Sequence, residues 1–285
     1  MSGAERRSIL VVPASSTHMI DKAAHLKADQ VLFDWEDAVA PSKKHDARRN
    51  ILDLLNSDRK FAAKYLSIRI NAISSSHFQN DLTALREISG NRLFSIVLPK
   101  VSSEEDLDVI ERELGTVIVE VQIESAVGLI NVNSIAAHQR TGSLSFGPLD
   151  YLADLGATTT DESDALFTYP LMKILLAGRA SGKLVFDGPE VDIRNLQKFE
   201  MSASRVQAMG FDGKWVLHPD QIDLCNRIFT PNEEEYKAAK ELIRRYETAL
   251  AQGQGAFIEG DEMIDEASCR RAAKIVARAE FFYQD

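Results

Sequence analysis

The feature that most limits the fold of this 285-residue chain is an alternation between short apolar runs and longer amphipathic segments. Eight of the apolar runs are rich in Val, Ile, Leu or Phe. They are almost continuously hydrophobic, which is typical of strands buried on both faces. These runs are SILVVPA, QVLFDWEDA, YLSIRINA, FSIVLPKV, VIVEVQIES, SLSFGPLD, KLVFDGP and GKWVLHP. A helical pattern follows each run, so the sequence predicts eight strand–helix units.

The amphipathic segments predict the helices of these units. They are His18–Ala28, Lys43–Asn56, Phe78–Ile88, Glu104–Leu114, Gly128–His138, Pro170–Ser181, Asp192–Met209 and Asp220–Phe229. Strands that alternate with helices usually pair in parallel. Eight such units favour a closed TIM (β/α)8 barrel over an open doubly wound sheet. The first unit also has no glycine fingerprint for a dinucleotide, which removes one reason to prefer the open sheet.

The pattern changes after Phe229. A helix start at residues 230–232, a Gly-containing link and a last helix over Ser268–Phe282 follow. We therefore predict a catalytic barrel over residues 1–229 and a C-terminal helical arm over residues 230–285. The last helix carries an apolar stripe that needs a partner. That partner is either the barrel's own wall or a neighbouring subunit, and we expect the neighbouring subunit.

Charge and composition exclude several classes of protein. The net charge of −10, from 33 basic and 43 acidic residues, argues against nucleic-acid binding, which depends on excess Lys and Arg. The apolar run Ile9–Val12 is too short for a signal peptide, and no stretch approaches the roughly 18–20 apolar residues of a membrane span. Cys225 and Cys269 have neither metal-ligand spacing nor a disulfide framework. We expect a cytoplasmic protein with no membrane or nucleic-acid partner.

The candidates for chemistry are the residues that end the predicted strands, because TIM-barrel active sites lie at the C-terminal ends of the strands. Glu124 and Asp150 end neighbouring runs. Two hard oxygen ligands there suit Mg²⁺, with substrate and water completing its octahedron. The other charged or polar strand ends are Asp34, Glu36, Asp37, Arg69, Asn71, Lys100, Asp187 and His218. So many charges at one end of a barrel require a metal or an ionic ligand to balance them.

Eight sequence pieces together resemble the citrate lyase beta-subunit-like branch of the aldolase/citrate lyase superfamily. They run in the family's order from Arg7 to Asp265. The pieces are RSILVVPASSTHMIDKA, ADQVLFDWEDAV, IRIN, LPKV, IESAVGLIN, FGPLDYLADLG, GFDGKWVLHPDQI and EGDEMID. The resemblance implies a TIM barrel and a homo-oligomer, either trimer or hexamer. It also implies a Mg²⁺-dependent lyase that cleaves or forms a carbon–carbon bond in a thioester such as citryl-, malyl- or citramalyl-CoA, by retro-aldol or Claisen chemistry.

The same resemblance implies roles for individual residues. It makes Glu124 and Asp150 the Mg²⁺ ligands, with Glu124 also at the substrate. It makes Arg69 the catalytic cation that holds the substrate carboxylate, a task suited to the planar Arg fork. Proton transfer at the thioester enolate is tied in this family to an Asp of the C-terminal segment, often at a neighbouring subunit's site. Asp265 is the matching residue here.

Four further residues are expected around this centre. In a strand, Asp34 and Glu36 share a face while Asp37 points the other way. We expect Asp34, Glu36 and Asp37 to hydrogen-bond to metal-bound water or to Arg69, the alternative being a purely structural network. Lys100 is expected to balance charge or to contact the thioester.

Several alternatives remain open from the residues alone. At the level of single residues they are a core salt bridge for Glu124, Asp154 in place of Asp150, simple pairing of Arg69 with Glu36 or Asp37, a Schiff base at Lys100 and a general base at His218. At the level of the whole protein they are a metal-dependent aldolase for a free hydroxy-keto acid without CoA, and a non-catalytic barrel subunit.

This chain departs from the family's pattern at three places. Ala14 replaces a usual Gly, Trp35 replaces a usual Leu, and Pro148-Leu149 replaces the usual Ala-Glu before the metal-binding Asp. None of these changes removes Glu124, Asp150 or Arg69. The activity class therefore follows from the resemblance, whereas the acyl group and its carrier, CoA or a protein, do not.

Overall fold

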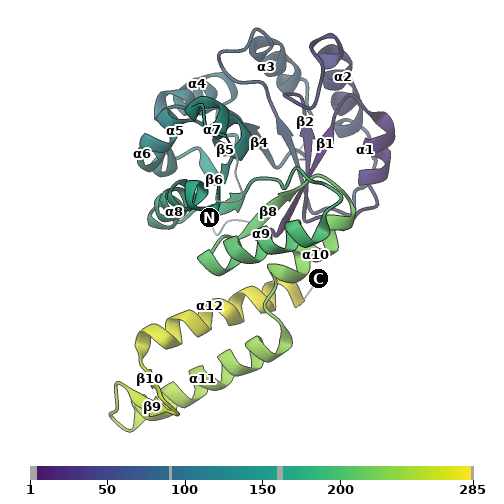
Figure 1. Ribbon diagram of the computed structural model, residues 1–285. Helices are drawn as coiled ribbons and strands as arrows, with labels where there is room; N and C mark the ends of the chain where they lie inside the picture. Colours follow the sequence, from purple (N-terminus) through teal and green to yellow (C-terminus); the bar gives the residue numbers. More distant parts are fainter. Residues whose placement is uncertain (1–4, 90–91, 159–162, 284–285) are drawn as a thin grey trace. The chain divides into compact units, whose positions relative to one another are not determined.

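The computed structural model describes residues 5–89, 92–158 and 163–283. The chain divides between Asn226 and Arg227 into two compact units. In the first unit, eight parallel strands pair in sequence order and close into a barrel, because β1 pairs with both β2 and β8 (Figure 1). The strands are β1 (Ser8–Pro13), β2 (Gln30–Asp34), β3 (Tyr65–Arg69), β4 (Ser95–Leu98), β5 (Val119–Ile123), β6 (Thr141–Phe146), β7 (Leu184–Asp187) and β8 (Gly213–Val216). The prediction of a TIM barrel is confirmed.

Helical segments surround this barrel (Figure 1). They are α1 (Thr17–Ala23), η1 (Pro41–Lys43), α2 (Lys44–Leu55), α3 (Phe78–Arg86), α4 (Glu104–Leu114), α5 (Ala126–Ile130), α6 (Val132–Ala137), α7 (Pro148–Leu155), α8 (Ser163–Ala180), α9 (Leu196–Met209) and α10 (Asp220–Ile228). The helix expected over Gly128–His138 is instead two short helices, α5 and α6, which meet at Asn131.

Helix α7 was not expected, and it changes the setting of Asp150. The strand ends at Phe146, and Pro148 then occupies the start of α7, where its fixed φ and missing N–H are tolerated. The helix ends at Gly156, whose φ of 64° is left-handed. Asp150 therefore lies in the first turn of a helix, and not at the end of a strand as the sequence suggested.

The N-terminal end of the barrel interior holds a buried polar network. Gln30 donates to Ser67 Oγ at 2.8 Å and to Glu120 Oε1 at 2.9 Å, and Ser67 and Ser95 share a hydrogen bond of 2.7 Å. Arg6 closes this end, with its Nη2 atom 3.5 Å from Glu120 Oε2. Polar contacts at the N-terminal face of a TIM barrel serve stability, because the chemistry occurs at the other end.

The second unit is a helical arm. Its helices α11 (Glu233–Ala251) and α12 (Glu266–Tyr283) run antiparallel, and the hairpin of β9 (Phe257–Glu259) and β10 (Glu262–Ile264) connects them (Figure 1). Sequence reasoning predicted both helices but treated the hairpin as a link, because three-residue strands give too short a pattern to recognise.

Two features set the ends and the surface of the arm. A capping box formed by Asn232 and Glu235 begins α11, as its acidic first turn suggests. Leu250, Ile258 and Met263 expose their apolar side chains, with exposed fractions between 55% and 78%. Ile258 and Met263 are cross-strand partners, so they share one face of the hairpin. The hairpin therefore presents an exposed apolar pair on that face.

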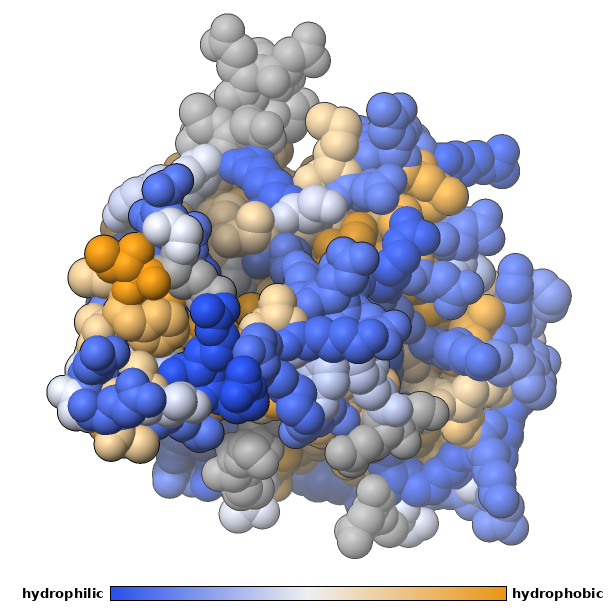
Figure 2. All heavy atoms as spheres, turned by 90° about the horizontal axis from the view of Figure 1, so that it is seen from below, coloured by the Kyte–Doolittle hydropathy of each residue, from blue (hydrophilic) through white to orange (hydrophobic). Residues whose placement is uncertain are grey.

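On the face shown in Figure 2, hydrophilic residues predominate and hydrophobic side chains form separate patches. Among the described helices, none is long and apolar enough to cross a membrane.

Candidate active site

An Arg–Asp pair joins the ends of β2 and β3. The strand register places Asp34 directly opposite Arg69. Arg69 donates from Nε to Asp34 Oδ1 at 2.8 Å and from Nη2 to Asp34 Oδ2 at 2.6 Å. Burial alone would raise the pKa of Asp34, but the charge and hydrogen bonds of Arg69 hold that pKa below its ordinary value. The Nε–Nη2 edge of the guanidinium therefore binds Asp34, and this contact fixes the orientation of the guanidinium.

Glu36 lies on the other side of the same guanidinium. It is only 4% exposed, and its Oε2 atom lies 3.1 Å from Arg69 Nη1. That oxygen accepts no hydrogen bond from the described residues. Burial raises the pKa of Glu36, although Arg69 and Lys100 act in the opposite direction. Asp34 and Glu36 therefore both contact Arg69, as their shared strand face suggests, and the alternative pairing of Arg69 with Glu36 is present.

Glu124 follows β5 and is 2% exposed. Its Oε1 atom accepts from the backbone N–H of Lys100 at 2.7 Å, and its Oε2 atom accepts from Gln122 Nε2 at 2.6 Å. Gly147 makes room for it, because a Cβ atom at residue 147 would lie 2.3 Å from Glu124 Oε2. Burial, followed by the negative charges of Asp150 and Glu36, raises the pKa of Glu124 to about 8.

Lys100 connects these residues to Asp150. Its ammonium lies 2.8 Å from Glu36 Oε1, 3.6 Å from Asp37 Oδ2 and 3.6 Å from Asp150 Oδ1. Burial would lower the pKa of Lys100, but the hydrogen bond and charge of Glu36 raise it above its ordinary value. A lysine held cationic in this way is a poor Schiff-base nucleophile, which requires the neutral amine. The contacts favour charge balance, the role expected for Lys100.

Two other acidic candidates have partners of their own. Asp154, the alternative to Asp150, accepts a hydrogen bond from the backbone N–H of Ala126 at 2.7 Å and so anchors α5. Asp265 belongs to the arm, where its Oδ1 atom accepts from the backbone N–H of Ser268 at 3.0 Å and caps α12. Hydrogen bonds from the Ser268 backbone are the main cause that lowers the pKa of Asp265. The role predicted for Asp265 in proton transfer stays a prediction.

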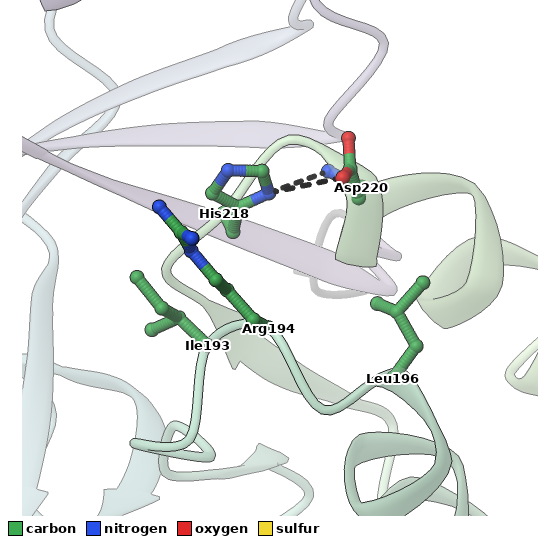
Figure 3. A pocket seen from close by; sticks show the side chains of 5 residues that line it. All are labelled: Ile193, Arg194, Leu196, His218 and Asp220. Carbon is green, nitrogen blue, oxygen red and sulfur yellow. Dashed lines mark hydrogen bonds and ion pairs between the residues drawn. The ribbon is translucent and has the colours of Figure 1, made fainter.

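A cavity of about 360 Å³ lies between the loops that follow β7 and β8. Figure 3 shows the Arg194 side chain directed towards His218, with Ile193, Leu196 and Asp220 completing the lining. His218 Nδ1 accepts a hydrogen bond of 3.3 Å from the backbone N–H of Asp220 and lies 3.5 Å from its carboxylate. The Nδ1 atom of His218 is therefore already engaged in a hydrogen bond within the turn at residues 218–220.

Strand register brings Asp34 to Arg69, which is one of the two contacts expected for the acidic residues at the end of β2. Sequence reasoning missed three contributors to the site. Gln122 is detectable by the two-residue period of β5, which places it on the same face as Glu124. Gly147 and Lys44 left no such signal. Lys44 reaches back from α2 to donate to the carbonyl oxygens of Trp35 and Glu36, at 2.8 and 2.9 Å.

Residues 7–219 of this chain match the family model described as HpcH/HpaI aldolase/citrate lyase. The chain belongs to this family. The recognition made from the sequence pieces is therefore confirmed, and the match covers the whole barrel from the start of β1 to the loop after β8.

Curated relatives within the family include two activities. An L-malyl-CoA/beta-methylmalyl-CoA lyase of Cereibacter sphaeroides is 35% identical, over 96% of this chain and 94% of the relative. A (3S)-malyl-CoA thioesterase of the same organism is 30% identical, with the same two shares covered.

Two solved structures of Mycobacterium tuberculosis proteins are similar to this chain. The CitE protein of Mycobacterium tuberculosis, solved with magnesium, acetoacetate and coenzyme A, has a TM-score of 0.82 and 28% identity. The similarity covers 97% of this chain and 99% of CitE. A citrate lyase beta subunit of the same organism, solved with oxaloacetate and magnesium, has a TM-score of 0.70 and 30% identity over 80% of this chain and 98% of that one.

Proposed function

We propose that this protein is a Mg²⁺-dependent carbon–carbon lyase that cleaves or forms a 3-hydroxyacyl-CoA thioester of the malyl-CoA type. One observation carries the proposal: Glu124, Asp150 and Arg69 belong to a single connected cluster at the C-terminal ends of β3, β5 and β6. The 35% identity to a malyl-CoA lyase and the CoA-bound CitE neighbour support a CoA thioester as the substrate.

The charges of this cluster fit a divalent cation. Its carboxylates outnumber its cations by two, which equals the charge of one Mg²⁺ ion. The carboxylates are Asp34, Glu36, Asp37, Glu124 and Asp150, and the cations are Lys44, Arg69 and Lys100. Carboxylate oxygens and water are the ligands that Mg²⁺ prefers. Glu124 and Asp150 are the residues that would hold the ion.

When bound, Mg²⁺ would supply Lewis-acid stabilisation of the oxygen that becomes the carbonyl of the released oxo acid. The protein's own groups orient the substrate. A substrate carboxylate would bind on the Nη1 side of the Arg69 guanidinium, where Glu36 also lies, while Asp34 keeps the plane of the guanidinium fixed. Gln122 and the Lys100 amide hold the Glu124 carboxylate in place.

The arm completes the proposal. Asp265 supplies the proton at the thioester enolate, in the site of a neighbouring subunit, within a trimer or hexamer of this chain. Ile258 of β9 and Met263 of β10 form an exposed apolar pair, and β10 ends directly before Asp265, which supports a docking role for this segment. We also propose that the protein works in the cytoplasm, which suits its two free thiols.

The experiment is a product assay with malyl-, citramalyl- and citryl-CoA, each with and without Mg²⁺. A lyase releases acetyl-CoA together with glyoxylate, pyruvate or oxaloacetate, respectively. A thioesterase, the activity of the 30% identical relative, would instead release free CoA and the intact hydroxy acid. A metal-dependent aldolase without CoA would act only on the free hydroxy-keto acid. A non-catalytic subunit would turn over none of these compounds.

Variants assign the activity to the site. Glu124→Gln and Asp150→Asn should each abolish the Mg²⁺-dependent release of acetyl-CoA. The matched control is Asp154→Asn, four residues after Asp150, which alters the contact to Ala126 and should keep the activity. Full activity in Glu124→Gln or Asp150→Asn would show that the metal ligands are assigned wrongly.

A further inference from the structure

Lys100 is the one residue in the described part of the site for which contacts to both proposed Mg²⁺ ligands are observed. Its backbone N–H donates to Glu124 Oε1 at 2.7 Å, and its ammonium lies 3.6 Å from Asp150 Oδ1. The same ammonium is anchored on the other side by Glu36 at 2.8 Å. A positive charge is therefore built into the chain beside the carboxylates that would receive a metal ion.

The backbone of Lys100 indicates that this charge has a function. Its φ of 55° is left-handed, and Lys100 is the only residue other than glycine with a positive φ in the described part of the chain. A glycine would adopt this conformation without strain and would still offer its N–H to Glu124. Strained backbone that persists points to a role for the side chain. Here the side chain adds the ammonium and its three carboxylate contacts.

We infer that Lys100 is a tethered cation that competes with Mg²⁺ for Asp150 and so lowers the affinity of the site for the ion. The inference rests on the proposed function, which makes Asp150 a Mg²⁺ ligand. Mg²⁺ binds carboxylate oxygens at about 2.0–2.1 Å, so an ammonium that lies 3.6 Å from the same carboxylate is repelled by the ion. Glu36 and Asp37 retain the ammonium when Asp150 turns to the metal.

The competition gives Lys100 a second effect. In protein freed of metal by a chelator, the ammonium offsets the mutual repulsion of Glu36, Glu124 and Asp150. Removal of this charge therefore destabilises the metal-free protein and strengthens Mg²⁺ binding. Substitution of a residue that merely supports the fold would destabilise the metal-free protein without strengthening Mg²⁺ binding.

The test is calorimetric titration of Mg²⁺ into metal-free wild-type protein and Lys100→Met, with the thermal melting of both proteins measured in chelator. Methionine keeps the unbranched shape and most of the length of the side chain, together with the backbone N–H, but removes the charge. We expect Mg²⁺ to bind Lys100→Met more tightly by about tenfold or more, since a positive charge close to the ion is removed. The melting temperature of the metal-free variant should fall.

Three further variants make the result specific. Lys100→Arg keeps the charge and should bind Mg²⁺ as the wild-type protein does, within about threefold. Lys100→Gln is a second uncharged variant and gives the same readout if Lys100→Met does not fold. Lys43→Met removes an exposed lysine that pairs with Asp46 at 3.4 Å, and it should change neither Mg²⁺ affinity nor melting.

The outcomes separate this inference from the proposed function. Unchanged or weaker Mg²⁺ binding in the folded uncharged variants would overturn the competition while leaving the lyase proposal intact. If the wild-type protein binds no Mg²⁺, or if Glu124→Gln leaves its binding unchanged, the metal site itself fails and this inference fails with it.

Discussion

Lowering the pH from 8 to 6 should weaken Mg²⁺ binding about 50-fold, because of the environment of Glu124. Burial and the charges of Asp150 and Glu36 raise the pKa of Glu124 to about 8 in the absence of metal. A carboxyl group must lose its proton before it ligates a metal ion. About half of the Glu124 side chains are ionised at pH 8 and about one in 100 at pH 6, so the apparent free energy of binding falls by about 2.3 kcal/mol.

The assay is titration calorimetry at half-unit steps from pH 5.5 to 9.5, in two buffers with different heats of ionisation. As the pH rises towards 8, the logarithm of Kd should fall by about one unit for each pH unit. Above pH 9 it should no longer change. Each ion bound at pH 6 should release about one proton, which the difference between the two buffers reports. Glu36→Gln removes one of the charges that raise this pKa and should shift the midpoint below 8.

The stability of the metal-free protein gives an independent check of the same pKa. The folded-state pKa of Glu124 lies above its ordinary value of 4.5. This group's contribution to stability is therefore fully present below about pH 4.5 and is lost as the pH rises to about 8, a change of up to about 5 kcal/mol. Urea unfolding should show Mg²⁺ stabilising the protein more at pH 8 than at pH 6. A Kd for Mg²⁺ that is constant between pH 6 and 8 would refute the reasoning.

Three further predictions follow from the site. Arg69→Lys should lower kcat/KM by the equivalent of about 2–4 kcal/mol, because a lysine cannot bind two planar carboxylates at once; wild-type kinetics would exclude the carboxylate role. Gly147→Ala should displace Glu124, since its Cβ would lie 2.3 Å from Oε2, and should reduce Mg²⁺-dependent kcat at least about tenfold, whereas Gly255→Ala, with open space around it, should have no effect. Mixing Asp265→Ala with Arg69→Ala subunits should restore activity if sites are shared between chains, and a mixture as inactive as its parts would place each site within one chain.

The fold was largely predictable because the barrel strands are buried on both faces. Each strand appears in the sequence as a β-branched, apolar run that no helix pattern imitates. The helix boundaries were less accurate, and one helix was absent from the prediction. The sequence FGPLDYLADLG joins an apolar strand to an apolar helix, so its periodicity shows no break between Phe146 and Pro148. Only the proline at the first helical position marks that boundary.

The site was predictable as a set of residues but not as a set of contacts. The rule that chemistry lies at strand ends selects Arg69, Lys100 and Glu124, since each ends or follows a barrel strand. Which side chains meet depends on register and on backbone conformation. The pairing of Arg69 with Asp34 follows from the alignment of β2 with β3, and the contacts of Lys100 follow from a left-handed φ that no sequence pattern encodes.

The two proposed metal ligands differ in how firmly the fold holds them, and this difference explains where the site can be adjusted. Glu124 is buried at a strand end with both carboxylate oxygens hydrogen-bonded, so its position is set by the barrel. Asp150 has a side chain that is 38% exposed, in the first turn of a short helix, and its ammonium contact is 3.6 Å long. The dipole of α7 favours a negative charge there but does not fix its direction. Asp150 is therefore the ligand that Lys100 can hold or release, while Glu124 keeps its place in either case.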